Sequence, residues 1–152
     1  MTTRYAQTTD VSSDRSRSEI EKTLTRYGAT TFAYGWDADR ASIQFVMDGR
    51  QVRFVLPLPD RRDREFTHHS RGARTDSAAE AAYEQAVRQR WRALALMVKA
   101  KLEAVAAGIV SFEVEFLPHT VLPSGRTVAD DVLPAVAIAY DTGAVTPLQI
   151  TA

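Results

Sequence analysis

The sequence predicts an α+β fold: an N-terminal helix, a three-stranded antiparallel meander packed on one long helix, and a C-terminal hairpin with a short helix. Two patterns indicate this class. Apolar residues alternate with a period of two through three consecutive runs between residues 30 and 58, and one helical stripe of apolar residues spans residues 83–105. At 152 residues, of which 45% are hydrophobic and 25% charged, the chain has the length and composition of one globular domain.

The first ordered element is predicted to begin near Ser16. The preceding residues are polar and have little to bury, so we expect residues 1–15 to be a disordered tail and residues 16–150 to form a single domain. Ser16 and Glu19 have the S-x-x-E spacing of a capping box, which marks a helix start. Gly28 stands where a C-terminal cap is expected, so the spacing predicts a helix of about ten residues.

Three alternating runs follow between Thr30 and Leu58 and predict an antiparallel meander. Asp48-Gly49 is typical of a two-residue type I′ turn, and residues 37–40 fit a four-residue loop. These two turns fix a register that collects the large apolar residues on one face. We expect that face to be core, and it comprises Phe32, Tyr34, Trp36, Ile43, Phe45, Met47, Val52, Phe54 and Leu56.

A long connection and a long helix come next. Prolines end the third run, and the following loop, residues 60–74, is so long that it is either functional or disordered. A second S-x-x-E motif at Ser77 opens an alanine-rich helix that runs to Ala107 and is capped by Gly108. Its regular apolar stripe predicts that it covers the aromatic face of the sheet.

The last forty residues permit more than one interpretation. Residues 112–116 fit either a short strand or a helical turn capped by Ser111. Residues 121–128 predict a tight hairpin around Pro-Ser-Gly. A final helix over about residues 129–141 would contain Pro134 as a kink or as its first residue, and would end at Gly143. Its residues predicted to face inward are Val132, Leu133, Val136 and Tyr140.

A formal net charge of zero conceals a segregation of charge along the chain. Residues 1–39 carry a net charge of −1, residues 40–101 carry +6 and residues 102–152 carry −5. Most basic residues of the middle block are arginines, whose planar guanidinium binds phosphate with two hydrogen bonds and stacks on bases. The acidic block either pairs with a basic block, which would support a homo-oligomer, or only provides solubility.

The predicted nucleic-acid interface combines the loop, one ridge of the long helix and the sheet. Arg88, Arg92 and Lys99 form the ridge, because they lie 4 and 7 residues apart. The aromatic residues of the sheet are assigned to the core, so the stacking role falls to Phe66. The same arginines also fit an ordinary solvated surface. The complete predicted set is Arg50, Arg53, Arg61, Arg62, Arg64, Phe66, Arg71, Arg74, Arg88, Arg92 and Lys99.

Several kinds of chemistry are excluded or disfavoured. The chain has no cysteine, which excludes disulfides, iron–sulfur clusters and a cysteine nucleophile, and it has no Walker A, G-x-S-x-G or G-x-G-x-x-G motif. His68, His69 and His119 lack the spacing of a zinc site. We predict no catalytic residue, metal or cofactor. A small hydrolase that uses His68 or His69 is the weakest alternative.

No apolar run in the sequence approaches the ~20 residues of a membrane-spanning helix. The first eighteen residues also lack the hydrophobic core of a signal peptide. Together with the missing cysteines, these observations predict a cytoplasmic protein with no membrane partner.

Seven segments, taken in order, support a family resemblance: Arg26-Tyr27-Gly28-Ala29, Tyr34-Gly35-Trp36 and residues 52–59, 88–94, 99–105, 122–128 and 139–143. On these segments the chain, from about Ser16 to Leu148, resembles a family of small proteins from tailed bacteriophages and prophages. The resemblance implies a phage-encoded accessory protein that acts in the host cytoplasm during genome replication, recombination or the contest with host defences. It implies no particular activity and no functional residues.

The leading hypothesis is a non-enzymatic protein that binds nucleic acid, with single-stranded DNA preferred, and that works as a homo-oligomer. The alternative is an inhibitor of a host defence enzyme or another host enzyme. In that case the same arginines would bind a nucleotide signal or an acidic surface of a host protein.

Overall fold

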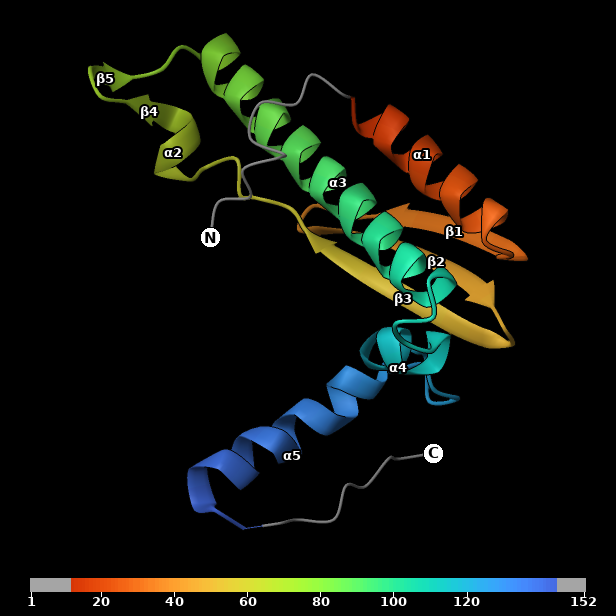
Figure 1. Cartoon of the computed structure of the whole chain (residues 1–152). Helices are drawn as coiled ribbons and strands as arrows, with labels where there is room; N and C mark the ends of the chain where they lie inside the picture. Colours follow the sequence, from red (N-terminus) through yellow and green to blue (C-terminus); the bar gives the residue numbers. More distant parts are fainter. Residues whose placement is uncertain (1–11, 145–152) are drawn as a thin grey trace.

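The computed structural model describes residues 12–144 and has the predicted α+β architecture (Figure 1). One sheet has the strand order β1-β2-β3, and a second, two-stranded sheet consists of β4 and β5. In chain order the elements are α1 (Ser13–Arg26), β1 (Thr31–Trp36), β2 (Arg40–Met47), β3 (Arg50–Pro57), α2 (Arg64–Thr67), β4 (His68–His69), β5 (Gly72–Ala73), α3 (Asp76–Ala106), α4 (Phe112–Phe116), the 3-10 helix η1 (Leu117–His119) and α5 (Val128–Thr142).

Helix α1 begins three residues before its predicted start. Ser12 is the N-cap, and its hydroxyl accepts a hydrogen bond from the backbone N–H of Arg15 at 3.2 Å. Ser16, the predicted cap, is buried within the helix. Residues 12–15 are therefore part of the folded structure and not of a tail. Residues 1–11 of the predicted tail, and residues 145–150 of the predicted domain, lie outside the described residues.

The sheet has the predicted register in both hairpins. Met47 pairs with Arg50 across the two-residue turn, and Trp36 pairs with Ala41 across the four-residue loop of residues 37–40. Asp48 and Gly49 have φ angles of 49° and 70°, which is the type I′ geometry. The left-handed backbone of the turn thus confirms the register inferred from Asp-Gly.

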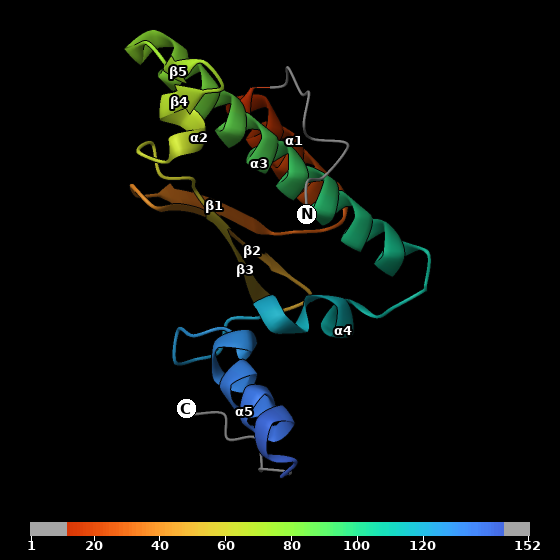
Figure 2. The same ribbon diagram turned by 90° about the vertical axis from the view of Figure 1, so that its left-hand side faces the viewer.

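Helices α1 and α3 lie side by side over one face of the three-stranded sheet (Figures 1 and 2). They run parallel, since Glu19 contacts Arg92 at 2.7 Å whereas the later Tyr27 donates a hydrogen bond to the later Glu103 at 2.5 Å. The buried core between the layers comprises Ile20, Leu24, Ala41, Ile43, Phe45, Met47, Val52, Phe54, Trp91, Leu94, Ala95, Val98, Leu102, Phe112 and Phe116.

The aromatic face of the sheet is buried only where helices cover it. Phe45 and Phe54 are in the core, but Trp36, the last residue of β1, is 71% exposed. Tyr34 lies between these extremes, with its ring edge-on to Trp91 at 5.7 Å between centroids. The assignment of Trp36 to the core is wrong, because alternation identifies the face of a strand and not how far the covering helices extend.

Helix α3 is longer than the sheet that it covers. It begins at Asp76 with Thr75 as N-cap, and Gly108 ends it with a φ of 73°, as predicted. Its 31 residues span about 46 Å at 1.5 Å per residue, whereas an eight-residue strand such as β3 spans about 26 Å. The N-terminal part of α3 therefore extends past the sheet, where α2, β4 and β5 accompany it (Figure 1).

The connection between β3 and α3 is ordered. It contains α2 and the small β4–β5 hairpin, in which His68 pairs with Ala73. Phe66 anchors it to α3: the side chain is only 4% exposed and its ring is edge-on to Tyr83, with centroids 5.6 Å apart. A single buried aromatic residue thus fixes a segment that the sequence leaves as either functional or disordered.

The segment after α3 closes the core at the β3 edge. Residues 112–116 are helical, and the Ser111 hydroxyl caps them by accepting from the N–H of Val114 at 3.3 Å. The Phe116 ring is edge-on to Phe45 at 6.0 Å. The predicted hairpin follows, with Leu122 N–H bonded to the Arg126 carbonyl at 2.8 Å.

Helix α5 projects away from the rest of the molecule (Figures 1 and 2). Leu133 is 62% exposed and Tyr140 is 88% exposed, so the prediction that they face inward is wrong. The sequence pattern identifies these residues as apolar, but among residues 12–144 no element covers them. Pro134 lies within the helix and is not its first residue.

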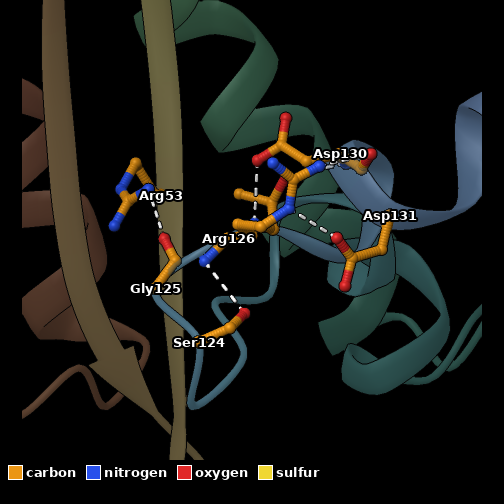
Figure 3. Close-up of polar contacts among 7 residues, drawn as sticks. Arg53, Ser124, Gly125, Arg126, Asp130 and Asp131 are labelled. Carbon is orange, nitrogen blue, oxygen red and sulfur yellow. Dashed lines mark hydrogen bonds and ion pairs between the residues drawn. The ribbon is translucent and has the colours of Figure 1, made fainter. Parts of the chain in front are cut away.

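Arg126 joins the hairpin to the start of α5 (Figure 3). Its Nε donates to the Asp131 carboxylate at 2.6 Å and its Nη2 donates to the Asp130 carbonyl oxygen at 3.0 Å. Thr127 and Asp130 form a capping box at the same place. On the other side of the hairpin, Arg53 of β3 donates to the Gly125 carbonyl at 3.0 Å.

Candidate nucleic-acid interface

Trp36 forms one wall of an open hollow of about 570 Å³. Strand β1 ends at this residue, and the tight turn after it brings Asp37 and Asp39 to the rim. The opposite wall is Tyr83 and Val87 of α3. A hollow of this volume lies within the range of small-molecule sites. The complete lining is Trp36, Asp37, Ala38, Asp39, Leu58, Pro59, Asp60, Arg61, Arg62, Tyr83 and Val87.

Arg61 and Arg62 enter the hollow from the segment after β3. Arg90 of α3 holds the start of this segment, because its Nη1 donates to the Pro57 carbonyl at 2.9 Å. The Arg61 guanidinium lies over the Tyr83 ring, 4.0 Å from its centroid, and also pairs with Glu80. Arg61 is therefore held in place, with a cation–π contact to an aromatic wall of the hollow.

Arg62 is more available than Arg61. Its side chain is 89% exposed, and it makes a bidentate contact with Asp60, with Nε–Oδ1 and Nη2–Oδ2 distances of 3.1 and 2.9 Å. The hydrogen bonds from Arg62 lower the pKa of the Asp60 carboxyl to about 2. A phosphate at Arg62 must therefore compete with a carboxylate that is ionised at neutral pH.

The rim carries further carboxylates. Asp37 organises the β1–β2 turn, since its Oδ1 accepts from the backbone N–H groups of Asp39 and Arg40 at 2.9 and 3.0 Å. These bonds lower the pKa of Asp37. Carboxylate oxygens accept hydrogen bonds from base amino groups, so the hollow presents both base-recognising and phosphate-binding chemistry around one exposed indole.

Arg88 lies beside this site, but Arg92 does not extend it. Arg88 borders a second hollow of about 280 Å³, which shares Arg61, Tyr83 and Val87 with the first. The Arg88 guanidinium is held by the Gln85 side-chain oxygen at 2.6 Å. Arg92 instead faces α1 and pairs with Glu19. The predicted exposed ridge is therefore wrong at Arg92, because α1 packs along that side of α3.

The α2–β5 segment places further predicted residues near the overhanging part of α3. Arg64 and Arg71 are exposed, and Arg74 is half-buried. Phe66 is buried against Tyr83, so its ring is not available to stack on a base. Phe66 thus lacks the exposure that its predicted stacking role requires, and an exposed ring at this site is instead that of Trp36, which the sequence pattern assigns to the core.

Three predicted residues lie elsewhere. Arg50 is the first residue of β3, at the opposite end of the strand from Pro57 and about 24 Å from it. Arg53 is committed to the Gly125 carbonyl (Figure 3). Lys99 is exposed on α3, about two turns beyond Arg92. The hollow therefore unites Arg61 and Arg62, with Arg88 adjacent, and leaves these three residues apart.

The histidines of the β4–β5 hairpin take part in local contacts. The His68 Nδ1 lies 2.8 Å from the Thr67 hydroxyl, and the His69 Nδ1 accepts from the Arg71 N–H at 3.0 Å. Within residues 12–144 no group of three metal-ligating side chains of the His, Cys, Asp or Glu type comes together.

Comparison with known proteins gives no match to a family model, a curated protein or a solved structure. The described helices also include none with the length and apolar character needed to span a membrane.

The sequence contains a signal for some of the site residues that it does not assign to the site. Trp36 is the last residue before a turn, and an aromatic residue at a strand end is the one that a covering helix is least certain to reach. Tyr83 is the first residue of the α3 apolar stripe, at the end that overhangs the sheet. No pattern in the sequence indicates that Arg61 stacks on Tyr83, because this contact depends on the path of the intervening segment.

Proposed function

We propose that this protein binds nucleic acid, with single-stranded DNA preferred, by stacking a base on Trp36 and holding the adjacent phosphates with Arg61 and Arg62. The observation that supports the proposal is an exposed indole beside an exposed guanidinium at a hollow of nucleotide size. Aromatic platforms combined with cationic side chains are the general solution for single-stranded nucleic acid. Arg88 borders the adjoining hollow and extends the basic surface there, and the exposed Arg64 follows Arg62 two residues later in the chain.

The carboxylates at the rim favour single strands over duplex. They repel the continuous phosphate backbone of a duplex but accept hydrogen bonds from unpaired bases. In a single strand a base can leave its neighbours and enter the hollow, whereas a duplex must first be unpaired. On the family resemblance, the protein is a phage-type accessory protein in the host cytoplasm. We further propose that it is non-enzymatic and that it works as a homo-oligomer, in which the acidic block of one copy pairs with the basic block of another.

The test is a salt titration of binding to labelled single-stranded DNA, duplex DNA and RNA of one length. The association constant for single-stranded DNA should fall by about 0.7 log units per phosphate contact for each tenfold rise in salt concentration. Arg62→Ala should reduce that slope by about one contact, whereas the matched variant Arg50→Ala, an exposed arginine at the other end of the sheet, should leave it unchanged. Failure to bind any of the three at low salt would refute the proposal.

Trp36 itself offers a direct readout. The only other tryptophan, Trp91, is buried, so a Trp91→Phe protein reports on Trp36 alone. Stacking of a base should quench its fluorescence. Trp36→Ala should weaken binding by about 5- to 150-fold, as expected for one base–aromatic stack, and Trp36→Phe should retain part of the affinity.

The second candidate is an inhibitor that sequesters a nucleotide signal or binds an acidic surface of a host protein. The mixed charge of the hollow favours a compact ligand with both amino and phosphate groups. A free mononucleotide that binds as tightly as an oligonucleotide would support the nucleotide form. A host protein retained in a pull-down after nuclease treatment would support the protein-binding form.

A further inference from the structure

Helix α5 is apolar all round between residues 132 and 140, and part of this apolar surface is exposed. Residues 132–140 contain no charged or hydrogen-bonding side chain except the Tyr140 hydroxyl. Leu133, Val136, Ile138 and Tyr140 are all exposed. A helix that is apolar all round is normally buried, and α5 instead extends away from the sheet (Figure 2). This surface is independent of the Trp36 hollow.

Most apolar residues of α5 fall into two stripes, and the exposed Ile138 lies outside both. Val128, Val132, Ala135 and Ala139 are half-buried, at steps of 4, 3 and 4, and α5 contacts η1 within its own chain. The second stripe comprises Leu133, Val136, Ala137 and Tyr140, all exposed, at positions i, i+3, i+4 and i+7. This spacing is that of a helix face which packs against another helix.

The exposed stripe is self-complementary in an antiparallel pair. If two copies of α5 cross between Val136 and Ala137, Leu133 of each copy lies opposite Tyr140 of the other, and Val136 lies opposite Ala137. Each position then pairs a large side chain with a smaller one, or a leucine with a tyrosine ring. The small side chain of Ala137 allows close approach at the centre.

The helix ends favour the antiparallel direction. Asp141 lies one residue beyond the stripe, and in the antiparallel pair it lies opposite Val132, near the start of the other α5, which is the positive end of that helix dipole. The side chains at this end are the acidic Asp130 and Asp131 and the cation Arg126, which is 56% exposed and pairs with Asp131 (Figure 3). In a parallel pair Asp141 would instead meet its own copy, which is unfavourable.

We infer that α5 is a self-association helix: two copies of this chain pair through Leu133, Val136, Ala137 and Tyr140 in an antiparallel arrangement. The inference specifies the homo-oligomer of the proposed function but does not depend on its ligand. The stripe is only about 10 Å long at 1.5 Å per residue. The contact is therefore small, and the dimer dissociates on dilution.

Sedimentation equilibrium of the full chain without nucleic acid tests association. A monomer–dimer equilibrium is expected, and Leu133→Glu should weaken it at least tenfold without a change in the circular dichroism spectrum, because Leu133 is exposed in the monomer. Val114→Glu, at an exposed apolar residue of α4, is the matched control and should leave the equilibrium unchanged. A monomer at all concentrations would overturn the inference, and so would a Leu133→Glu protein that dimerises normally.

Disulfide trapping tests the direction. The chain has no cysteine, so Leu133→Cys and Tyr140→Cys proteins each carry a single thiol. Mixed and oxidised, they should form the heterodimer in excess of either homodimer. Predominant homodimers of each variant would overturn the antiparallel arrangement. Binding of single-stranded DNA, measured separately on the Leu133→Glu monomer, reports on the proposed ligand, so failures of the two proposals are distinguishable.

Discussion

Arg126 donates a hydrogen bond to the backbone carbonyl oxygen of Asp130, at 3.0 Å. In a regular helix that carbonyl would accept from the N–H four residues later, but position 134 is a proline and has no N–H. The same guanidinium pairs with the Asp131 carboxylate, whose side chain is 4% exposed. One arginine from the hairpin thus satisfies an acceptor that Pro134 leaves open and pairs with one oxygen, Oδ1, of a carboxylate that is almost completely buried.

Arg126→Ala should therefore destabilise the protein by about 1–3 kcal/mol, because it leaves the buried Asp131 carboxylate without its cation. The loss should be smaller in a Pro134→Ala background, where the restored N–H serves the Asp130 carbonyl. Urea denaturation of the four proteins of this double-mutant cycle measures the coupling. Arg40→Ala, which removes an exposed ion pair with Asp37, is the control and should cost less than about 1 kcal/mol. Equal losses for the two arginines would contradict the account.

Substitutions of Phe66 and Trp36 should have separate effects, the first on the stability of the protein and the second on its binding of single-stranded DNA. Phe66→Ala removes a buried ring from its contact with Tyr83 and should cost about 3–5 kcal/mol, unless only the overhanging segment opens. Trp36→Ala removes a mostly exposed side chain and should change stability much less while it lowers affinity for single-stranded DNA. Denaturation and fluorescence anisotropy on both variants give the comparison. A Trp36→Ala protein that loses stability but retains affinity would contradict the assignment.

The Asp60–Arg62 contact predicts a titration below the ordinary range of a carboxyl group. The pKa of Asp60 falls from 3.8 to about 2 because Arg62 donates two side-chain hydrogen bonds and one backbone hydrogen bond to it. A lowered folded-state pKa means that the contact stabilises the fold above about pH 4 and is lost as the pH falls through 2. Carbon-detected NMR of the Asp60 carboxyl should give this midpoint, and Arg62→Ala should return it towards 3.8. An unchanged midpoint in Arg62→Ala would contradict the cause.

Protonation of His119 should destabilise the folded protein in mild acid. Its ring lies against Phe54, with centroids 4.3 Å apart, and burial together with nearby Lys101 lowers its pKa below 6.5. The folded state thus binds the proton less readily than the unfolded state, so stability is complete above about pH 6.5 and declines as the pH falls through the lowered pKa. Unfolding free energies between pH 8 and 5 should show the decline in the natural sequence, and His119→Gln should reduce it.

Local signals predict the sheet and the C-terminal ends of α1 and α3 well, whereas the N-caps lie two to four residues before the predicted Ser77 and Ser16. Asp48-Gly49 determines the β2–β3 register because few dipeptides tolerate two successive left-handed residues. The alternation of apolar residues in β1 then allows one register of β1 on β2. Gly28 and Gly108 end their helices for the same backbone reason. These features depend on residues close together in the chain, which is the information that a sequence pattern contains.

The departures all concern what covers a surface. The apolar periodicity of α5 is correct, but the pattern does not state that a second element lies against it. Trp36 is on the predicted face, yet the covering helices do not extend over it. Arg92 has the predicted spacing but faces α1, whose place beside α3 depends on contacts such as that with Glu19. Whether another element packs over a surface depends on how the whole chain folds, so the apolar periodicity of one segment cannot predict it.

The N-terminal part of α3, which extends past the sheet, should unfold locally more often than the part that is packed in the core. Residues from Trp91 to Leu102 are packed in the core, so their amides should exchange hydrogen only through global unfolding. The first turns of α3, from Asp76, have no strand beneath them and rely on Phe66 and the β4–β5 hairpin, so they should exchange through local opening. The Trp36 hollow lies at this junction, and a ligand held there would slow exchange in the first turns while leaving the core amides almost unaffected.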